Sequence, residues 1–275
     1  MDLEAFFISQ FADMRIGDDG AFIDGYVYSK DAFFENVHFK KEWMSHYQIA
    51  QKAMIVNISD SIAMNATPKY ILLSVAMPKN ITKQEMKDLA RGFSDTAKKY
   101  NCEIIGGDTI SNTKLDITIT VIGKTKKPLY RSGIKKGFLI GYTGEIGNAK
   151  KDLKKLFNKG FIHKKSKFVH TELRKEFMRR SENILRAGMD ISDGLFSDLD
   201  KFAKINSLGF KFLNKIPKAI GCSGEEYEIL FAIDPRDKKA LMRRAKVART
   251  KITFIATAVQ KKYINRCKSH HFEGK

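Results

Sequence analysis

Two apolar segments in the first half of the chain constrain the fold most. Tyr70–Met77 is a continuous apolar run that Pro78 ends, as is typical of a strand buried on both faces. Leu115–Gly123 is rich in β-branched residues that alternate with others, the pattern of a second strand. Between them, Thr82–Glu85 predicts a capping box that opens a helix ending near Tyr100. Because strands and helices are interleaved, we expect an α/β or α+β fold class.

The rest of the chain continues this interleaved pattern. The other expected elements are short strands at Tyr26–Tyr28, Ala32–Phe39 and Glu103–Ile105, a helix over Tyr47–Ala66, a strand over Phe138–Thr143, a basic helical region to about Ala187, a helix to about Asn206, a short strand near Phe210, a helix from Pro235 and a strand over Ile252–Ala258. Both halves of the chain therefore contain strands and helices.

A segment rich in Lys, Pro and Gly, Lys124–Lys136, separates the two halves. Such composition marks a loop or linker between periodic segments. The length of 275 residues suits one large domain or two modest ones. We place the boundary in this linker and expect an N-terminal domain over residues 1–130 and a C-terminal domain over residues 131–275.

The charge balance indicates anionic partners without selecting one. The net charge is +19, which favours nucleotides, phosphorylated metabolites, nucleic acid or acidic membrane as ligands. Much of the excess lies at Lys124–Arg180 and Lys238–Lys268, where a solvated basic surface is the simpler interpretation. Because no aromatic residues interleave with basic ones as they do at nucleic-acid interfaces, we expect no nucleic-acid partner.

The chain shows no long uncharged apolar run, so we expect no membrane-spanning helix. Its acidic N-terminus does not resemble a signal peptide. The three cysteines, Cys102, Cys222 and Cys267, are far apart and show neither disulfide nor zinc spacing. These features predict a cytoplasmic location with reduced cysteines.

Aspartates recur at glycine turns, strand ends and helix starts. They are Asp18, Asp19, Asp31, Asp60, Asp108, Asp190 and Asp193. Aspartate supplies the hard oxygen ligands that Mg²⁺ prefers, whereas carboxylates brought together without a cation repel one another and are partly protonated. The pattern therefore predicts that these residues hold divalent metal ions against the phosphates of a nucleotide.

Each of these motifs has a simpler interpretation by itself. Asp-Asp-Gly is an ordinary turn sequence, and Asp193 could cap the helix that begins near Gly194, although that leaves Asp190 unexplained. Asp60 differs because it lies in an apolar helix, where a buried acid needs a partner or an ion. Neither a P-loop nor the protein-kinase motif set is present, so phosphate chemistry here requires another scaffold.

The order of the motifs is more specific than any one of them. In chain order they are GDDGA (17–21), ENVHF (35–39), NISD (57–60), AMNATP (63–68), GGDT (106–109), RSG (131–133), MDISDGL (189–195) and SGEEYE (223–228). This set resembles the thiamine-monophosphate kinase family of the aminoimidazole-ribonucleotide synthetase-like superfamily, over nearly the whole chain. The resemblance implies a two-domain fold whose N-terminal domain forms an intersubunit β-barrel in a homodimer, with an ATP cleft at the interface.

The resemblance also implies an activity and a set of site residues. The implied reaction is direct in-line phosphoryl transfer from ATP, the co-substrate, to thiamine monophosphate, with several Mg²⁺ ions and no covalent nucleophile. The implied metal ligands are Asp19, Ser29, Asp31, Asp60, Asp108, Asp190 and Asp193; the ATP contacts are Gly107, Asp108, Arg131 and Ser192; the substrate contacts are His38, Glu225 and Phe272.

The chain departs from the family pattern in three places. Lys30 stands where the family usually has a hydroxyl residue, the segment KKSKFVHTELRKEFMRR (164–180) replaces a Pro- and Arg-rich one, and the tail HHF (270–272) lacks an acid. The alternatives are another ATP-dependent enzyme of the superfamily, a basic nucleic-acid-binding protein, and a metal-dependent phosphatase.

Overall fold

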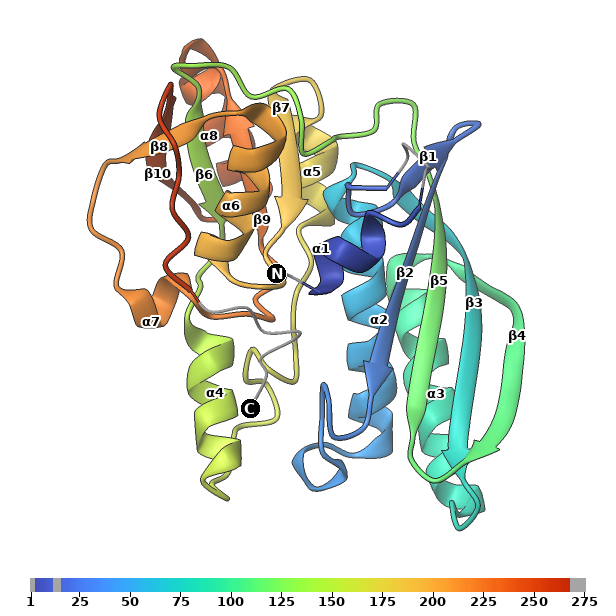
Figure 1. The fold of residues 1–275 in the computed structure, drawn as a ribbon. Helices are drawn as coiled ribbons and strands as arrows, with labels where there is room; N and C mark the ends of the chain where they lie inside the picture. The colour runs from blue at the N-terminus through green and yellow to red at the C-terminus, as the bar shows by residue number, and fades with distance from the viewer. Residues whose placement is uncertain (1–2, 12–15, 268–275) are drawn as a thin grey trace.

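The computed structural model describes residues 3–11 and 16–267 and contains two five-stranded sheets (Figure 1). The first sheet has the order β1-β2-β5-β3-β4, and the second has the order β7-β9-β6-β10-β8. Helix α2 (His46–Ala63) packs on β2, β3 and β5 of the first sheet and also contacts β7 of the second. The protein is therefore of the α/β class, with α2 as the element that joins its two halves.

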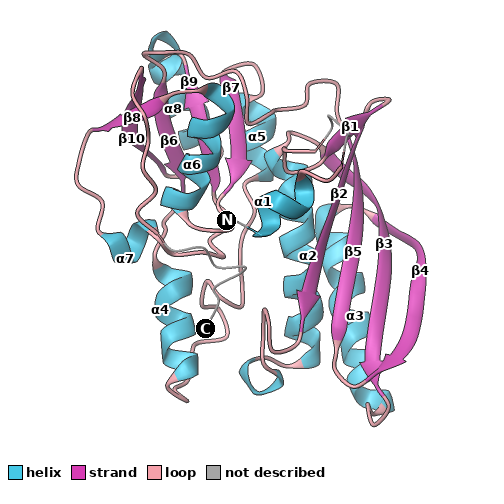
Figure 2. Cartoon of the chain, in the orientation of Figure 1, coloured by secondary structure: helices cyan, strands magenta, loops and turns pink. Residues whose placement is uncertain are grey.

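The first sheet carries helices on one face. Its strands are β1 (Ala21–Ile23), β2 (Tyr26–Phe34), β3 (Thr67–Pro78), β4 (Glu103–Asn112) and β5 (Asp116–Lys124). All neighbours are antiparallel except the parallel pair β3 and β4. Helices α2 and α3 (Lys83–Tyr100) lie on the same face (Figure 2), whereas Tyr28, Tyr70 and Leu72 are exposed.

Local sequence explains how these helices begin and pack. Ser45 and Thr82 cap α2 and α3, each in a capping box with the residue three positions later, and the second box was predicted. Gly92 of α3 lies against α2, where an added Cβ would be 2.4 Å from the Tyr47 carbonyl oxygen. A glycine is required at this crossing because any side chain would push the two helices apart.

The second sheet is covered on both faces and is antiparallel throughout. Its strands are β6 (Leu139–Thr143), β7 (Leu185–Asp190), β8 (Gly209–Phe212), β9 (Ile229–Ile233) and β10 (Ile252–Val259). Leu230 and Ala232 pack in one core cluster with α6 (Leu195–Asn206), whereas Phe231 packs in another with α5 (Lys175–Ser181) and α8 (Lys238–Val247). A strand buried on both faces explains the uninterrupted apolar sequence of β9.

The remaining elements lie at the ends and edges of this frame. They are α1 (Leu3–Ile8), the 3-10 helix Lys41–Trp43, α4 (Asn148–Phe157), α7 (Lys218–Gly221) and the 3-10 helix Pro235–Asp237. Among the described residues, no helix is long and apolar enough to cross a membrane.

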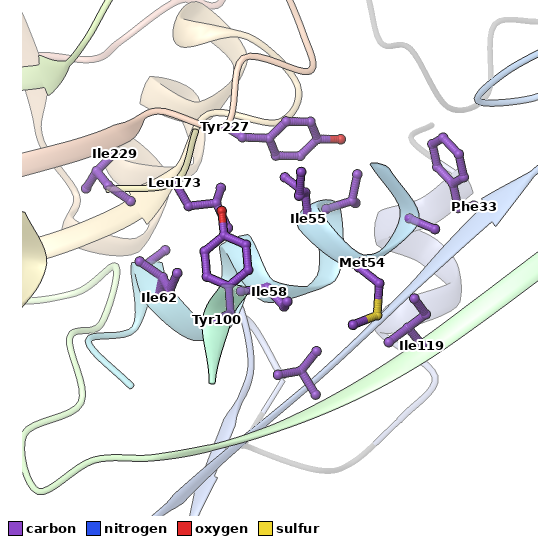
Figure 3. Close-up of a cluster of buried hydrophobic side chains, with 14 of the residues drawn as sticks. Phe33, Met54, Ile55, Ile58, Ile62, Tyr100, Ile119, Leu173, Tyr227 and Ile229 are labelled. Atoms are coloured by element: carbon purple, nitrogen blue, oxygen red, sulfur yellow. The ribbon is translucent and has the colours of Figure 1, made fainter. Parts of the chain in front are cut away.

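One buried cluster connects the two halves. Ile55, Ile58 and Ile62 of α2 pack in it together with Tyr227 and Ile229, which belong to the second half (Figure 3). Close packing of this kind makes the relative position of the elements costly to change. As a result, α2 has a fixed place beside the loops that follow β7 and precede β9.

Several expectations were wrong. The segment expected to be helical up to about Ala187 ends in the first residues of strand β7, because Leu185–Asp190 pairs with β9 and is buried except at Arg186. The two short strands expected at 26–28 and 32–39 are a single strand, β2, followed by a turn. Strand β9 was not predicted, and β4 continues well past Ile105.

The cysteine expectation was also wrong. Cys222 and Cys267 form a disulfide with a Cα–Cα distance of 5.6 Å, although 45 residues separate them. The segment after β10 returns beside the end of α7, a contact that spacing along the sequence does not predict. Cys102 is the free cysteine.

Candidate metal and phosphate site

Three aspartates from distant parts of the chain meet at one point. Asp19 precedes β1, Asp60 lies in the last turn of α2, and Asp190 ends β7. One carboxylate oxygen from each lies within 4.8 Å of the others. The Asp19 and Asp190 side chains are each only 2 % exposed, and Asp60 is partly buried. We call Asp19, Asp60 and Asp190 the acid centre.

Direct hydrogen bonds fix the acid centre in place. The hydroxyl of Ser59 donates to Asp190 Oδ2 at 2.6 Å, and the backbone N–H of Asp190 donates to Asp19 Oδ2 at 3.3 Å. Helix α2 thus supports Asp190 through Ser59, the residue directly before Asp60. Sequence reasoning assigned no role to Ser59, although it lies in the NISD motif, which carries the signal.

Strand β2 brings Ser29 and Asp31 to the same helix. Asn57 accepts the Asp31 backbone N–H on its side-chain oxygen at 2.7 Å, and its carbonyl accepts the Ser29 hydroxyl at 3.4 Å. The Asn57 amide in turn donates to the Ala53 carbonyl at 2.9 Å. Asn57 is a second unassigned residue of the NISD motif, and it holds β2 beside the acid centre.

The electrostatics of the acid centre suit a cation. Burial raises the pKa of Asp60 well above its ordinary value, and the charges of Asp31, Asp190 and Asp19 raise it further. Burial and the Asp19 charge raise the pKa of Asp190 in the same way. Buried like charges of this kind are relieved by protons or by a metal ion. Because all the donors are carboxylate oxygens, the residues present fit Mg²⁺.

Arg131 is already engaged with the acid centre. Its Nε and Nη2 donate to Asp19 Oδ1 at 3.1 and 2.5 Å, and its Nη1 donates to the Gly17 carbonyl at 3.0 Å. Its backbone N–H donates to Asp18 at 2.7 Å. Burial by itself lowers the pKa of Arg131, but the charge and hydrogen bond of Asp19, together with the charges of Asp190 and Asp198, outweigh that effect and raise the pKa. Arg131 is therefore the positive charge that the chain itself supplies here.

Asp193 and Ser192 lie on the loop between β7 and α6. Asp193 Oδ2 accepts from the Lys201 ammonium at 2.6 Å, and the same ammonium donates to Asp198 at 2.9 Å. The carbonyl of Ser192 accepts the backbone N–H of Glu225 at 2.7 Å. This loop therefore joins the end of β7, where Asp190 lies, to the SGEEYE segment.

Gly107 and Asp108 lie apart from the acid centre within one chain. They are exposed on the edge strand β4, next to a groove of about 370 Å³ between β4 and α3. Three strand spacings separate β4 from β2, so Asp108 is roughly 14 Å from Asp31 along the sheet. At Gly107 an added Cβ would lie 1.6 Å from the Leu73 carbonyl oxygen, so a glycine is needed for the β3–β4 pairing.

The three expected substrate residues have different surroundings. His38 accepts the Phe34 backbone N–H on Nδ1 at 2.9 Å and stacks on Phe33, an arrangement that holds the turn after β2. Glu225 is one quarter exposed and pairs with Lys52 of α2 at 2.5 Å. Phe272 lies outside the described residues.

The segment that replaces the family's Pro- and Arg-rich stretch closes over the SGEEYE loop. Arg174 donates to both carboxylate oxygens of Glu228 at 2.7 Å, and Lys167 lies 3.1 Å from Glu226. Phe168, the next residue, packs against Lys52. The divergent segment therefore supplies cations to the two buried glutamates beside Glu225.

The fold and the acid centre define a protein of the aminoimidazole-ribonucleotide synthetase-like class. Residues 17–125 match the family described as AIR synthase related protein, N-terminal domain. The solved structure of AaThiL complexed with AMPPCP and TMP superposes with a TM-score of 0.85 at 22% identity, covering 98% of this chain and 96% of that one.

Curated relatives narrow the class to one family. The thiamine-monophosphate kinase of Bacillus subtilis (strain 168) is 34% identical over 221 residues, which are 74% of this chain and 68% of that protein. The thiamine-monophosphate kinase of Buchnera aphidicola subsp. Schizaphis graminum is 35% identical over 258 residues, 82% and 78% of the two chains. The chain belongs to the thiamine-monophosphate kinase family, and it is a kinase.

Proposed function

We propose that this protein transfers the terminal phosphoryl group of ATP to thiamine monophosphate, producing ADP and thiamine diphosphate. The family of its relatives supports the reaction, and the AaThiL complex with AMPPCP and TMP supports the two substrates. The single observation that carries the proposal is the acid centre, where oxygens of Asp19, Asp60 and Asp190 lie within 4.8 Å of one another beside Arg131.

The proposed metal ligands start from the acid centre. Asp19, Asp60 and Asp190 would hold Mg²⁺, with Ser29 and Asp31 alongside them on β2 and Asp193 on the loop after β7. When bound, Mg²⁺ supplies charge neutralisation for the phosphates of ATP and for the charge that develops during transfer.

The chain's own residues orient the reacting groups. We propose direct in-line transfer without a covalent enzyme intermediate, in which positioning and electrostatic stabilisation supply the rate. Arg131 has a planar guanidinium that can face a phosphate while one edge stays on Asp19. Ser192 lies on the loop that also anchors Glu225, so ATP and acceptor contacts are mechanically linked.

A second copy of the chain would bring Asp108 to the acid centre. The face of the first sheet opposite α2 and α3 exposes large apolar side chains, including Tyr28, Tyr70 and Ile110. Pairing of two such faces would bury them in the expected intersubunit barrel, with ATP at the interface. We also keep the proposal of two domains, residues 1–130 and 131–275, in a cytoplasmic homodimer.

A coupled assay of ADP release tests the proposed function. We expect release that requires both Mg²⁺ and thiamine monophosphate and that falls at least 100-fold in Asp190→Asn, since loss of one preorganised electrostatic contact costs roughly that factor. ADP release that continued at the same rate without thiamine monophosphate would contradict the assigned acceptor. Unchanged turnover in Asp190→Asn would contradict the role of the acid centre.

A further inference from the structure

A lysine is buried between the two halves of the molecule. Lys52 of α2 is 2 % exposed, and its ammonium lies 2.5 Å from Glu225 Oε2 and 3.4 Å from the centre of the Phe168 ring. Burial lowers the pKa of Lys52, and the Glu225 charge acts in the opposite direction. A buried ammonium requires a partner of this kind, so Lys52 and Glu225 fix each other's position.

Lys52 occupies the same face of α2 as Ser59. Seven residues separate them, which is nearly two full turns and a rise of about 10 Å along the axis. Ser59 holds Asp190 at the acid centre, and Lys52 holds Glu225 in the SGEEYE loop. One rigid helix thus sets the distance between the phosphate end and the far end of the site.

The surroundings of Glu225 leave it little freedom of its own. Its backbone has a positive φ of 56°, and its N–H is bound to the Ser192 carbonyl. The following residues Glu226 and Glu228 are held by Lys167 and Arg174. The Glu225 carboxylate is one quarter exposed, whereas Glu226 and Glu228 are buried, and the Lys52 ammonium orients it.

We propose that Lys52 is a positioning residue that, through Glu225, selects an acceptor whose second ring lies about 10 Å from its phosphate. The inference rests on the proposed function. In thiamine monophosphate the thiazole carries the phosphate arm, and the aminopyrimidine is the far ring. A phosphorylated thiazole without the pyrimidine therefore reaches the acid centre but not Glu225.

The test compares these two acceptors on the full-length protein. In Lys52→Met, we expect the KM for thiamine monophosphate to rise about 10-fold, the loss typical of a hydrogen bond to a charged group. The KM for ATP and the affinity for hydroxyethylthiazole phosphate, measured by calorimetry, stay within about 2-fold. Lys87→Met makes the same substitution on the exposed face of α3 and serves as the matched control.

Two further variants separate positioning from a general loss of stability. Phe168→Leu leaves both charges in place and loosens the packing on Lys52, so it raises the same KM in the same direction. In the double variant Glu225→Gln with Lys52→Met, the KM for thiamine monophosphate should be no higher than in the weaker-binding single variant. Both substitutions break the same contact, so their effects do not add. Additive effects in this double variant would overturn the inference.

The remaining outcomes are also decisive. If neither Lys52→Met nor Phe168→Leu changes the preference for thiamine monophosphate over hydroxyethylthiazole phosphate, the inference is wrong. The proposed function still holds in that case, provided that the wild-type protein phosphorylates thiamine monophosphate. If Lys52→Met weakens the binding of thiamine monophosphate and of hydroxyethylthiazole phosphate equally, Lys52 has only a structural role, and the proposal that it selects the acceptor is wrong. Wild-type protein that phosphorylates neither acceptor overturns the proposed function and the inference together.

Discussion

Arg131 and Asp19, 112 residues apart, form an ion pair in which Nε and Nη2 of the guanidinium both donate to one oxygen, Asp19 Oδ1. The resemblance assigned one of these residues to phosphate and the other to metal. In the protein they bind each other, and the pair is largely shielded from water. Each partner therefore has a second proposed ligand, phosphate for Arg131 and a metal ion for Asp19.

Removal of Arg131 tests its role as the chain's own counter-ion. Arg131→Met leaves the Asp19 carboxylate buried without its partner, which costs about 3 kcal/mol of unfolding free energy when Mg²⁺ is absent. Urea denaturation with and without Mg²⁺ measures this. Mg²⁺ should recover part of the loss, because a bound cation replaces the missing charge.

Arg179→Met is the matched control for that experiment. Arg179 pairs with Glu176 on the exposed surface, where solvent screens the interaction. Removal of this ion pair should therefore change the free energy of unfolding little. Equal destabilisation of the two variants would argue against Arg131 as a buried counter-ion.

The stability of the metal-free protein should fall as pH rises from about 4 toward neutrality. The pKa values of Asp60 and Asp190 are raised above those of the unfolded chain, so the native state retains protons that the unfolded state has already lost. The native form is favoured at low pH, and that advantage disappears as pH passes through the raised values. Thermal melts across this range measure the slope.

Mg²⁺ should reverse this dependence. Its stabilising effect grows with pH because it binds the ionised carboxylates. Asp60→Asn removes one titrating group and should flatten the metal-free curve. A metal-free protein that became more stable between pH 4 and 7, with no response to Asp60→Asn, would rule out this account of the acid centre.

Mixing of inactive subunits tests whether Asp108 acts across a dimer. Asp108→Asn and Asp190→Asn should each lack activity, yet equal amounts refolded together should recover about a quarter of wild-type activity. Half of the dimers are then mixed, and each mixed dimer has one intact site of two. Sedimentation measures whether the refolded protein is dimeric. Mixed dimers without activity would place Asp108 outside the partner's site.

A count of reactive thiols tests the disulfide. Oxidised protein should show a single thiol, Cys102, after denaturation, and three after reduction. In the folded protein Cys102 should react slowly, since burial raises the pKa of its thiol to about 11.

Loss of the bridge in Cys267→Ser opens a loop of 45 residues, which lowers the free energy of unfolding by about 4 kcal/mol in the chain-entropy model. Three thiols in untreated protein would refute the bridge.

Local sequence determined the elements that depend on short-range interactions. The capping box at Thr82 starts α3 as predicted, and the apolar run ended by Pro78 forms β3. The GDDGA, NISD and MDISDGL motifs marked the three aspartates of the acid centre, Asp19, Asp60 and Asp190. These features are readable because hydrogen bonds and side-chain periodicity within a few residues decide them.

Tertiary structure alone decided which of these residues meet. The first residues of strand β7, Leu185–Ala187, were misread as helix because their strand partner is β9, about 45 residues further along the chain. The same holds for Asp190, whose backbone contacts Asp19 from 171 positions away, and for Lys52, whose partner Glu225 is 173 positions away. The amino-acid sequence by itself showed the aspartates and their local settings. The packing of α2 between two sheets, which no short segment encodes, determined which aspartates meet in the acid centre. It also left Asp108 apart from them.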